Sequence, residues 1–432
     1  MLARNGLPFL TKYDPFESPG GTVDPLGFFL PYTRLANEWM PDLTNAGTQP
    51  RYCSMLCRAA TLALEASRKE GLTGSDNRRF RLEIIKRYER IWVLACTAAM
   101  GVKAEGIGLR GITFAQRELL KRTITTEFSL LGNQMRYGAM GIYAPMSIGL
   151  ELLTPGYLPR NLGFDLSNAF PADADIDWLA AQAKGGILER DKLIEWGMRS
   201  RIGKMLVAER RILREALDLS RQRKLALELL ESIPVSETEL SNFTAVRERL
   251  RDKVARSDLE ESRMHLLDLI LRFEEFYRTS MLGFERVRWN ASTAGSGWKP
   301  SESDSILSGH LQKAKERATD FLASDEAMRL IFGSAQASMI FSGPIRLAHL
   351  TSSCSDRSEW ADTLVAHHRE VQLGRFGETT RKAPWIYSDR GALFIGANRY
   401  RMYEEVTSFD QLEPHSYKSS SALNFIGRDQ VV

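Results

Sequence analysis

Long apolar runs and cysteines are both scarce in this sequence of 432 residues. The longest apolar runs, such as IWVLACTAAM at 91–100, fall well short of the roughly 20 residues that a membrane span needs. The first residues, MLARNGLPFLTKYDPF, have no apolar core of the kind found in secretory signals. Of the 4 cysteines, only Cys53 and Cys57 are near one another. We therefore expect a soluble, cytoplasmic protein with reduced, buried thiols, without disulfides or bound metal.

Familiar catalytic and cofactor motifs are missing as well. There is no G-x-S-x-G, no H-E-x-x-H and no G-x-x-x-x-G-K-[ST]. GIGLRG at 106–111 has the letters of the dinucleotide fingerprint, but the preceding segment has helical periodicity and no βαβ alternation surrounds it. We interpret its glycines as a sharp loop between two helices, and we expect no cofactor.

Apolar spacing predicts helices along most of the chain. Hydrophobic residues make up 43% and charged residues 26%, values typical of a globular protein. Apolar residues recur every three to four positions at 53–71, 78–101 and through most of 178–283. Two aromatic-rich runs around Gly391, within 385–403, are typical of a hairpin. The expected fold class is mostly α: a multidomain helical protein with an internal winged helix and a small C-terminal β-hairpin.

Composition shifts suggest five segments. The first is rich in Pro, Gly and aromatic residues, and the fourth, NASTAGSGWKPSESD, has the composition of a linker. The predicted segments are 1–105 with N-terminal helices, a winged-helix domain at 106–175, a helical domain with a basic face at 176–289, a linker at 290–304, and an α+β domain at 305–432.

The winged-helix prediction depends on the segment LELLTPGYLPRNLGF. In many winged-helix proteins a recognition helix is followed by a short apolar strand and then L-T-x-x-G, which Leu153-Thr154-Pro155-Gly156 resembles. The resemblance implies a wing hairpin with Arg160 near a backbone phosphate. Pro145 conflicts with it, because proline disturbs a helix interior. The alternative is a helix–turn–loop connection between two layers of the core.

The strongest charge feature is the stretch 199–224, with nine basic residues against three acids. Arg210, Arg214 and Arg221 share one stripe of a helix, and such a stripe can follow phosphates. The alternative is a solvated helical face whose arginines pair with acids of the same helix or of another domain. The nine candidates are Arg199, Arg201, Lys204, Arg210, Arg211, Arg214, Arg221, Arg223 and Lys224. A second basic cluster comprises Arg78, Arg79, Arg81, Lys86, Arg87 and Arg90.

A basic and aromatic patch near the C-terminus is another candidate. Arg381, Lys382 and Trp385 combine charge with a ring that can stack on a base. The alternative is that these residues anchor the hairpin.

One group of nearby residues has side chains that are suited to catalysis. Asp362, His367, His368 and Glu370 lie on one predicted helix, and histidine is a common metal ligand or general base. Adjacent histidines face different sides of a helix, so the pair does not form a single site without local unwinding. A metal-dependent phosphoesterase or nuclease is therefore an alternative hypothesis beside a structural histidine pair.

In general character, rather than by any one motif, the chain is similar to uncharacterised bacterial proteins that accompany DNA-processing ATPases or nucleases in phage-defence loci. That resemblance implies a non-catalytic subunit that binds nucleic acid, with DNA as the expected ligand, while a partner protein performs the chemistry. A second alternative is a scaffold that buries apolar surface, including Phe28, Phe29 and Trp39, against partner subunits.

Overall fold

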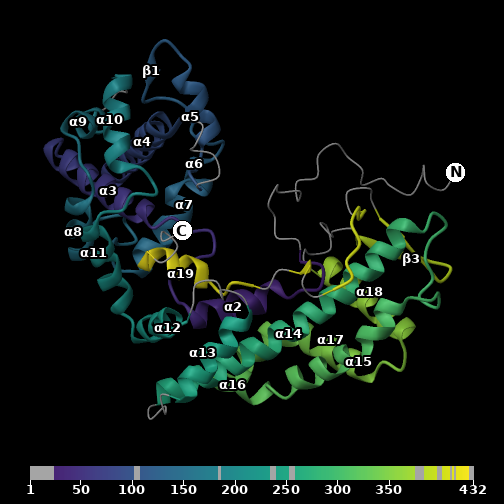
Figure 1. The fold of residues 1–432 in the computed structure, drawn as a ribbon. Coiled ribbons are helices and arrows are strands. Elements are labelled where there is room, and N and C mark those ends of the chain that lie inside the picture. Colours follow the sequence, from purple (N-terminus) through teal and green to yellow (C-terminus); the bar gives the residue numbers. More distant parts are fainter. Residues whose placement is uncertain are drawn as a thin grey trace. The chain divides into compact units, whose positions relative to one another are not determined.

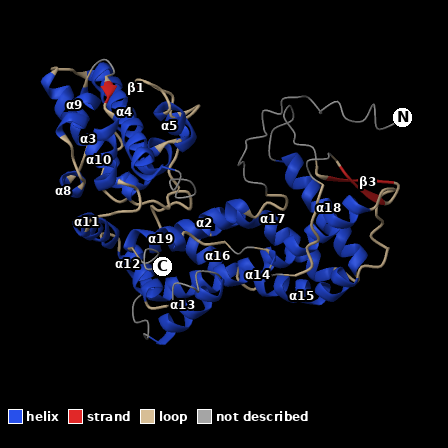
Figure 2. Ribbon diagram, turned by 45° about the horizontal axis from the view of Figure 1, so that its top comes forward, coloured by secondary structure: helices blue, strands red, loops and turns tan. Residues whose placement is uncertain are grey.

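The computed structural model describes residues 24–101, 108–182, 186–233, 240–252, 258–374, 384–396, 401–408, 411–412 and 415–427. Within them the chain forms 18 helices and two antiparallel strand pairs (Figures 1 and 2). The prediction of a mostly α fold with a C-terminal hairpin is confirmed.

The chain divides into two compact units. Unit 1 takes residues Met1–Arg34 and His265–His415, and unit 2 takes Leu35–Met264 and Ser416–Val432. Helices α2 (Phe29–Trp39) and α14 (Asp258–Thr293) contribute residues to both. The segment expected as a linker, 290–304, lies inside unit 1, where Trp298 forms a β-bridge with Leu393.

Unit 2 contains most of the helices. In chain order they are α3 (Arg51–Lys69), α4 (Gly74–Met100), α5 (Ile112–Leu119), α6 (Gln134–Tyr137), α7 (Ala139–Gly149), α8 (Asn161–Ala169), α9 (Ala174–Ala181), α10 (Arg190–Ser200), α11 (Val207–Asp218), α12 (Arg221–Glu231), α13 (Leu240–Asp252) and, near the C-terminus, α19 (Ser419–Ile426). The strands β1 (Ile124–Thr125) and β2 (Ile187–Leu188) pair antiparallel.

Helices α4 and α10 of unit 2 pack closely because α10 has a glycine at the point of contact. A Cβ atom on Gly197 of α10 would lie 2.0 Å from the carbonyl oxygen of Ala95 in α4. Trp92 of α4 is fully buried and donates from Nε1 to the carbonyl of Ser200 at 2.8 Å. The apolar face predicted around Tyr88, Ile91 and Trp92 thus forms the core of this unit.

Unit 1 is built from the remaining elements. They are the later part of α14, α15 (Ser305–Leu322), α16 (Asp325–Phe332), α17 (Ser334–Ser353), α18 (Arg357–Gly374), β3 (Ile386–Asp389) and β4 (Ala392–Ile395).

Aromatic side chains fill the core of unit 1. Phe276 and Phe321 stack at 5.3 Å between ring centroids, and Phe28 meets Phe276 edge-on at 5.7 Å. The expected hairpin is present: β3 and β4 turn at Arg390 and Gly391, both with positive φ. Two positive φ values at the centre of a two-residue loop match the twist of paired strands.

Two local predictions in the 106–175 segment have different outcomes. Gly108 and Gly111 both have positive φ and lie between α4 and α5, so the loop interpretation of the GIGLRG segment is confirmed for its described part. Leu153 and Pro159 form a single bridge around the Thr154 turn, while β1 pairs with β2 at 187–188, beyond this segment. This arrangement gives the winged-helix interpretation no support.

Candidate nucleic-acid interface

The basic stretch 199–224 runs from the end of α10 through α11 to the start of α12. Leucine, isoleucine and alanine on one side of α11 are buried, so the arginines are distributed over its flanks and its outer face. Arg211 lies on the outer face and is exposed, whereas Arg210 and Arg214 on the flanks are half-buried. The predicted single stripe is therefore wrong, because α11 ends at Asp218 and Arg221 begins the next helix, α12.

Arg223 points into unit 2. It is 3% exposed, it pairs with Asp42, and its Nε and Nη2 donate to the carbonyls of Leu217 and Ala216 at 3.1 Å. Burial lowers the pKa of Arg223, and the carboxylate of Asp42 partly offsets this effect. A guanidinium held in this way joins the end of α11 to α12 and is not accessible to a phosphate.

Four more of the predicted residues are engaged by carboxylates. Arg214 of α11 pairs with Asp218 on the same helix and with Glu231 of α12, and so stabilises the contact between the two helices. The other three pairs lie nearer the surface: Arg160 with Glu151 at 3.0 Å, Arg199 with Asp173 at 2.9 Å, and Arg221 with Glu260 at 3.5 Å. The alternative interpretation of the charge run, arginines paired with acids, describes these positions.

The five remaining cations of the stretch differ in their exposure to solvent. Lys204, Arg211 and Lys224 are exposed and Arg201 is half-buried, and none of the four pairs with a carboxylate among the described residues. Arg210 is half-buried, with its Nη1 close to Gly427 after α19. Of the nine predicted residues in this stretch, the fold thus leaves Lys204, Arg211 and Lys224 exposed and without a carboxylate partner among the described residues.

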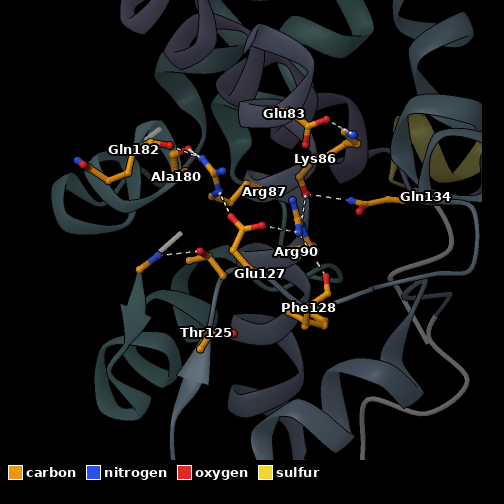
Figure 3. Close-up of polar contacts among 12 residues, drawn as sticks. Glu83, Lys86, Arg87, Arg90, Thr125, Glu127, Phe128, Gln134, Ala180 and Gln182 are labelled. Atoms are coloured by element: carbon orange, nitrogen blue, oxygen red, sulfur yellow. Dashed lines mark hydrogen bonds and ion pairs between the residues drawn. The ribbon is translucent and has the colours of Figure 1, made fainter. Parts of the chain in front are cut away.

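The second basic cluster, on α4, is divided: Arg87 and Arg90 are buried, whereas Arg81 and Lys86 are half-buried and Arg78 and Arg79 are exposed. Figure 3 shows Arg87 and Arg90 directed at Glu127, with Nε of Arg87 at 2.8 Å and Nη1 of Arg90 at 3.4 Å from its oxygens. Arg87 also donates to the carbonyls of Ala180 and Gln182 at the end of α9. These arginines connect α4 to two neighbouring segments, so their first role is structural.

The C-terminal patch is described only in part. Arg381 and Lys382 lie outside the described residues. Trp385 is 6% exposed, and the guanidinium of Arg288 lies 5.2 Å from its ring centroid. Its backbone N–H donates to Nε2 of His368 at 2.9 Å. Trp385 therefore anchors the hairpin on unit 1, which was the alternative interpretation.

The histidine pair binds backbone carbonyls. Nδ1 of His368 donates to the carbonyl of Pro25 at 2.9 Å, and Nε2 of His367 donates to that of Leu26 at 3.0 Å. Burial lowers the pKa of His367 and favours its neutral form. Glu370 pairs with Arg346. Throughout the part of the chain that the structure describes, no group of three or more His, Cys, Asp or Glu side chains could hold a metal ion. The hydrolase hypothesis gains no support.

A set of exposed cations that was not singled out from the sequence lies on α5 and α6 of unit 2. The guanidinium of Arg117 lies 5.7 Å from the ring centroid of Phe114, and that of Arg136 lies 5.3 Å from the ring of Tyr137. The rings are 39% and 47% exposed. The available signal was charge balance: residues 108–149 hold five basic residues and two acids.

No protein-family model matches this chain, and neither the curated proteins nor the solved structures include a significant match. Among the described helices, none combines the length and the apolar character needed to cross a membrane.

Proposed function

We propose that the chain is a non-catalytic subunit that binds the nucleic-acid backbone, with DNA as the first candidate, through exposed cations of unit 2. The observation that carries the proposal is the accessibility of Lys204, Arg211 and Lys224, which have no carboxylate partner among the described residues. Lysine and arginine in such positions release counterions from phosphates, which gives affinity that depends on salt and little on sequence.

The same geometry decides which cations to test. Reversing the charge of Arg214 or Arg223 would break contacts to Glu231 or Asp42 and weaken the fold, so loss of binding there would be ambiguous. Lys204, Arg211 and Lys224 avoid this difficulty because they are exposed.

The experiment is a titration of a labelled DNA duplex across salt concentrations with the variant Lys204→Glu, Arg211→Glu, Lys224→Glu. If each cation neutralises one phosphate, the slope of log affinity against log salt flattens by about 2.7, or 0.9 for each contact. A matched control reverses three exposed cations of unit 1: Lys299→Glu, Arg369→Glu and Arg390→Glu. The same slope for the triple variant, the control and the wild type would disprove the proposal.

The scaffold hypothesis has one observation in its favour. Four apolar side chains of unit 2 are between 64% and 87% exposed, namely Leu120, Val207, Ile187 and Trp178. Where such side chains form one contiguous patch, they mark a surface that meets another protein. A chain that binds no nucleic acid at low salt would favour this second function, with an ATPase or nuclease as the partner to test in a defence complex.

A further inference from the structure

Residues 108–149 of unit 2 carry an excess of positive charge that the fold does not neutralise. The two acids of this stretch are both occupied: Glu118 pairs with Lys121 at 2.5 Å, and Glu127 pairs with Arg87 and Arg90 of α4. No carboxylate among the described residues pairs with the remaining cations, which are Arg110, Arg117, Arg122 and Arg136.

Two exposed aromatic rings lie among these cations. Phe114 is on the first turn of α5 with Arg117 three positions later, and Tyr137 is the last residue of α6 directly after Arg136. Arg110 connects the two helices at this point, because it precedes the N-cap of α5 and its Nη1 donates to the carbonyl of Tyr137 at 3.4 Å. The start of α5 therefore lies next to the end of α6, and we call the exposed side chains of these two helices the α5–α6 surface.

Buried contacts with α4 and with the core hold the backbone of the α5–α6 surface in place. Glu89 of α4 is fully buried and accepts the backbone N–H of Ala139 at 2.7 Å and Nε2 of Gln134 at 2.7 Å. These bonds fix the junction between α6 and α7 next to Tyr137. On α5, Ala115 is fully buried and Leu119 nearly so, which leaves Phe114 on the outer side. A backbone that is already in place lowers the entropic cost of binding a ligand at the exposed rings.

We propose that the α5–α6 surface binds single-stranded nucleic acid, with Phe114 and Tyr137 stacking on bases and Arg117 and Arg136 contacting phosphates. Exposed rings stack only on bases whose faces are uncovered, and in a duplex the neighbouring base pairs cover those faces. Arginine beside each ring supplies the backbone charge that such surfaces combine with stacking. The inference extends the proposed function, which concerns the cations near α11 and α12, to a second surface and to a strand class.

The test measures the affinity of full-length protein for an oligothymidylate of about 16 nucleotides, the upper end of common site sizes, and for a duplex. Phe114→Ala and Tyr137→Ala should each weaken single-strand binding by roughly 5- to 150-fold, the usual value of one stacked base. Duplex affinity should stay within about twofold, because phosphate contacts elsewhere are intact. Circular dichroism should be unchanged, since both rings are on the surface.

Matched variants separate stacking from general loss of an exposed ring and from charge. Trp178→Ala removes a more exposed aromatic side chain of the same unit and should leave single-strand affinity unchanged. Arg117→Gln with Arg136→Gln should flatten the salt dependence of single-strand binding by about 1.4, or 0.7 for each phosphate. An oligouridylate in parallel distinguishes RNA from DNA strands, and loss of binding to either strand in Phe114→Ala and Tyr137→Ala supports the surface.

Failure of this inference differs from failure of the proposed function. In one outcome the wild type binds duplex, and the triple variant of Lys204, Arg211 and Lys224 alters that binding. If Phe114→Ala and Tyr137→Ala then bind single strands as the wild type does, only the α5–α6 surface is disproved. If the wild type binds neither form at low salt, both proposals are disproved.

Discussion

The guanidinium of Arg51 and the carboxylate of Glu209 form an ion pair of 3.1 Å in which both side chains are fully buried. Arg51 also donates to the carbonyls of Arg201 and Arg199, and Glu209 accepts the backbone N–H of Leu206 at 2.9 Å. Burial lowers the pKa of Arg51 and raises that of Glu209, while each partner opposes the shift of the other. The pair fixes the start of α11, the helix that carries Arg211, against α3.

Removing one partner of this pair should destabilise the protein strongly. Arg51→Met leaves the Glu209 carboxylate buried and without its counter-ion, and the expected loss is about 3–5 kcal/mol of unfolding free energy. The measurement is urea denaturation followed by circular dichroism. Arg199→Met breaks a surface pair of similar length and should cost less than about 1 kcal/mol. Equal losses for the two variants would contradict the structural role of the buried pair.

Gly197 should resist substitution. Alanine there would place a Cβ atom 2.0 Å from the carbonyl oxygen of Ala95, so α10 would have to move away from α4. We expect Gly197→Ala to lower the unfolding free energy by about 1–3 kcal/mol. Gly203 has no atom within 4 Å of the equivalent position, and Gly203→Ala should be neutral or slightly stabilising. Thermal denaturation of the two variants compares them directly, and a stable Gly197→Ala protein would refute the close approach.

The four cysteines should be unreactive in the native protein. All are free and buried, and burial raises the pKa of Cys53 and of Cys96 to about 12. Because the thiolate is the reactive form, a thiol-specific reagent at pH 8 should label none of them within minutes, and all four in denaturant. Rapid labelling of any one thiol in the folded chain would show that its burial is incomplete.

Lys418 should make stability depend on alkaline pH. Its Nζ donates to Oδ1 of Asn37 at 2.6 Å and to the carbonyl of Met40 at 2.8 Å, and burial lowers its pKa from 10.5 to about 8, although Asp42 and Glu38 act in the opposite direction. The folded state then holds this proton less tightly than the unfolded chain does. The stability contribution of Lys418 therefore increases as pH rises from about 8 to 10.5.

The measurement for Lys418 is the difference in unfolding free energy between the wild type and Lys418→Met across this pH range. That difference should change by up to about 3 kcal/mol in favour of the wild type as pH rises. The difference between the wild type and Lys224→Met, which alters an exposed lysine, should stay flat. A flat profile for Lys418→Met as well would show that the lysine titrates normally in the fold.

The sequence by itself determined the local structure and the fold class. The apolar spacing at 53–71 predicted α3, whose observed bounds are Arg51–Lys69, and the aromatic runs around Gly391 predicted the β3–β4 hairpin. These features depend on neighbours a few residues apart, through side-chain periodicity and the positive φ of a turn. The burial of the cysteines, expected from the size and class of the protein, is also observed.

Only the tertiary structure decided which charges are accessible. Arg223 and Lys224 are adjacent in a run that looks uniformly basic, yet Arg223 is buried against Asp42, which lies 181 residues earlier, and Lys224 is exposed. Periodicity shows that two neighbours face different sides of a helix, but not which side meets a distant carboxylate. The same limit hid the α5–α6 surface. The cations of this surface have no carboxylate partner among the described residues, and Glu127, an acid of the same stretch, pairs with Arg87 and Arg90 of α4 instead. A pairing between such distant segments forms only when the chain folds.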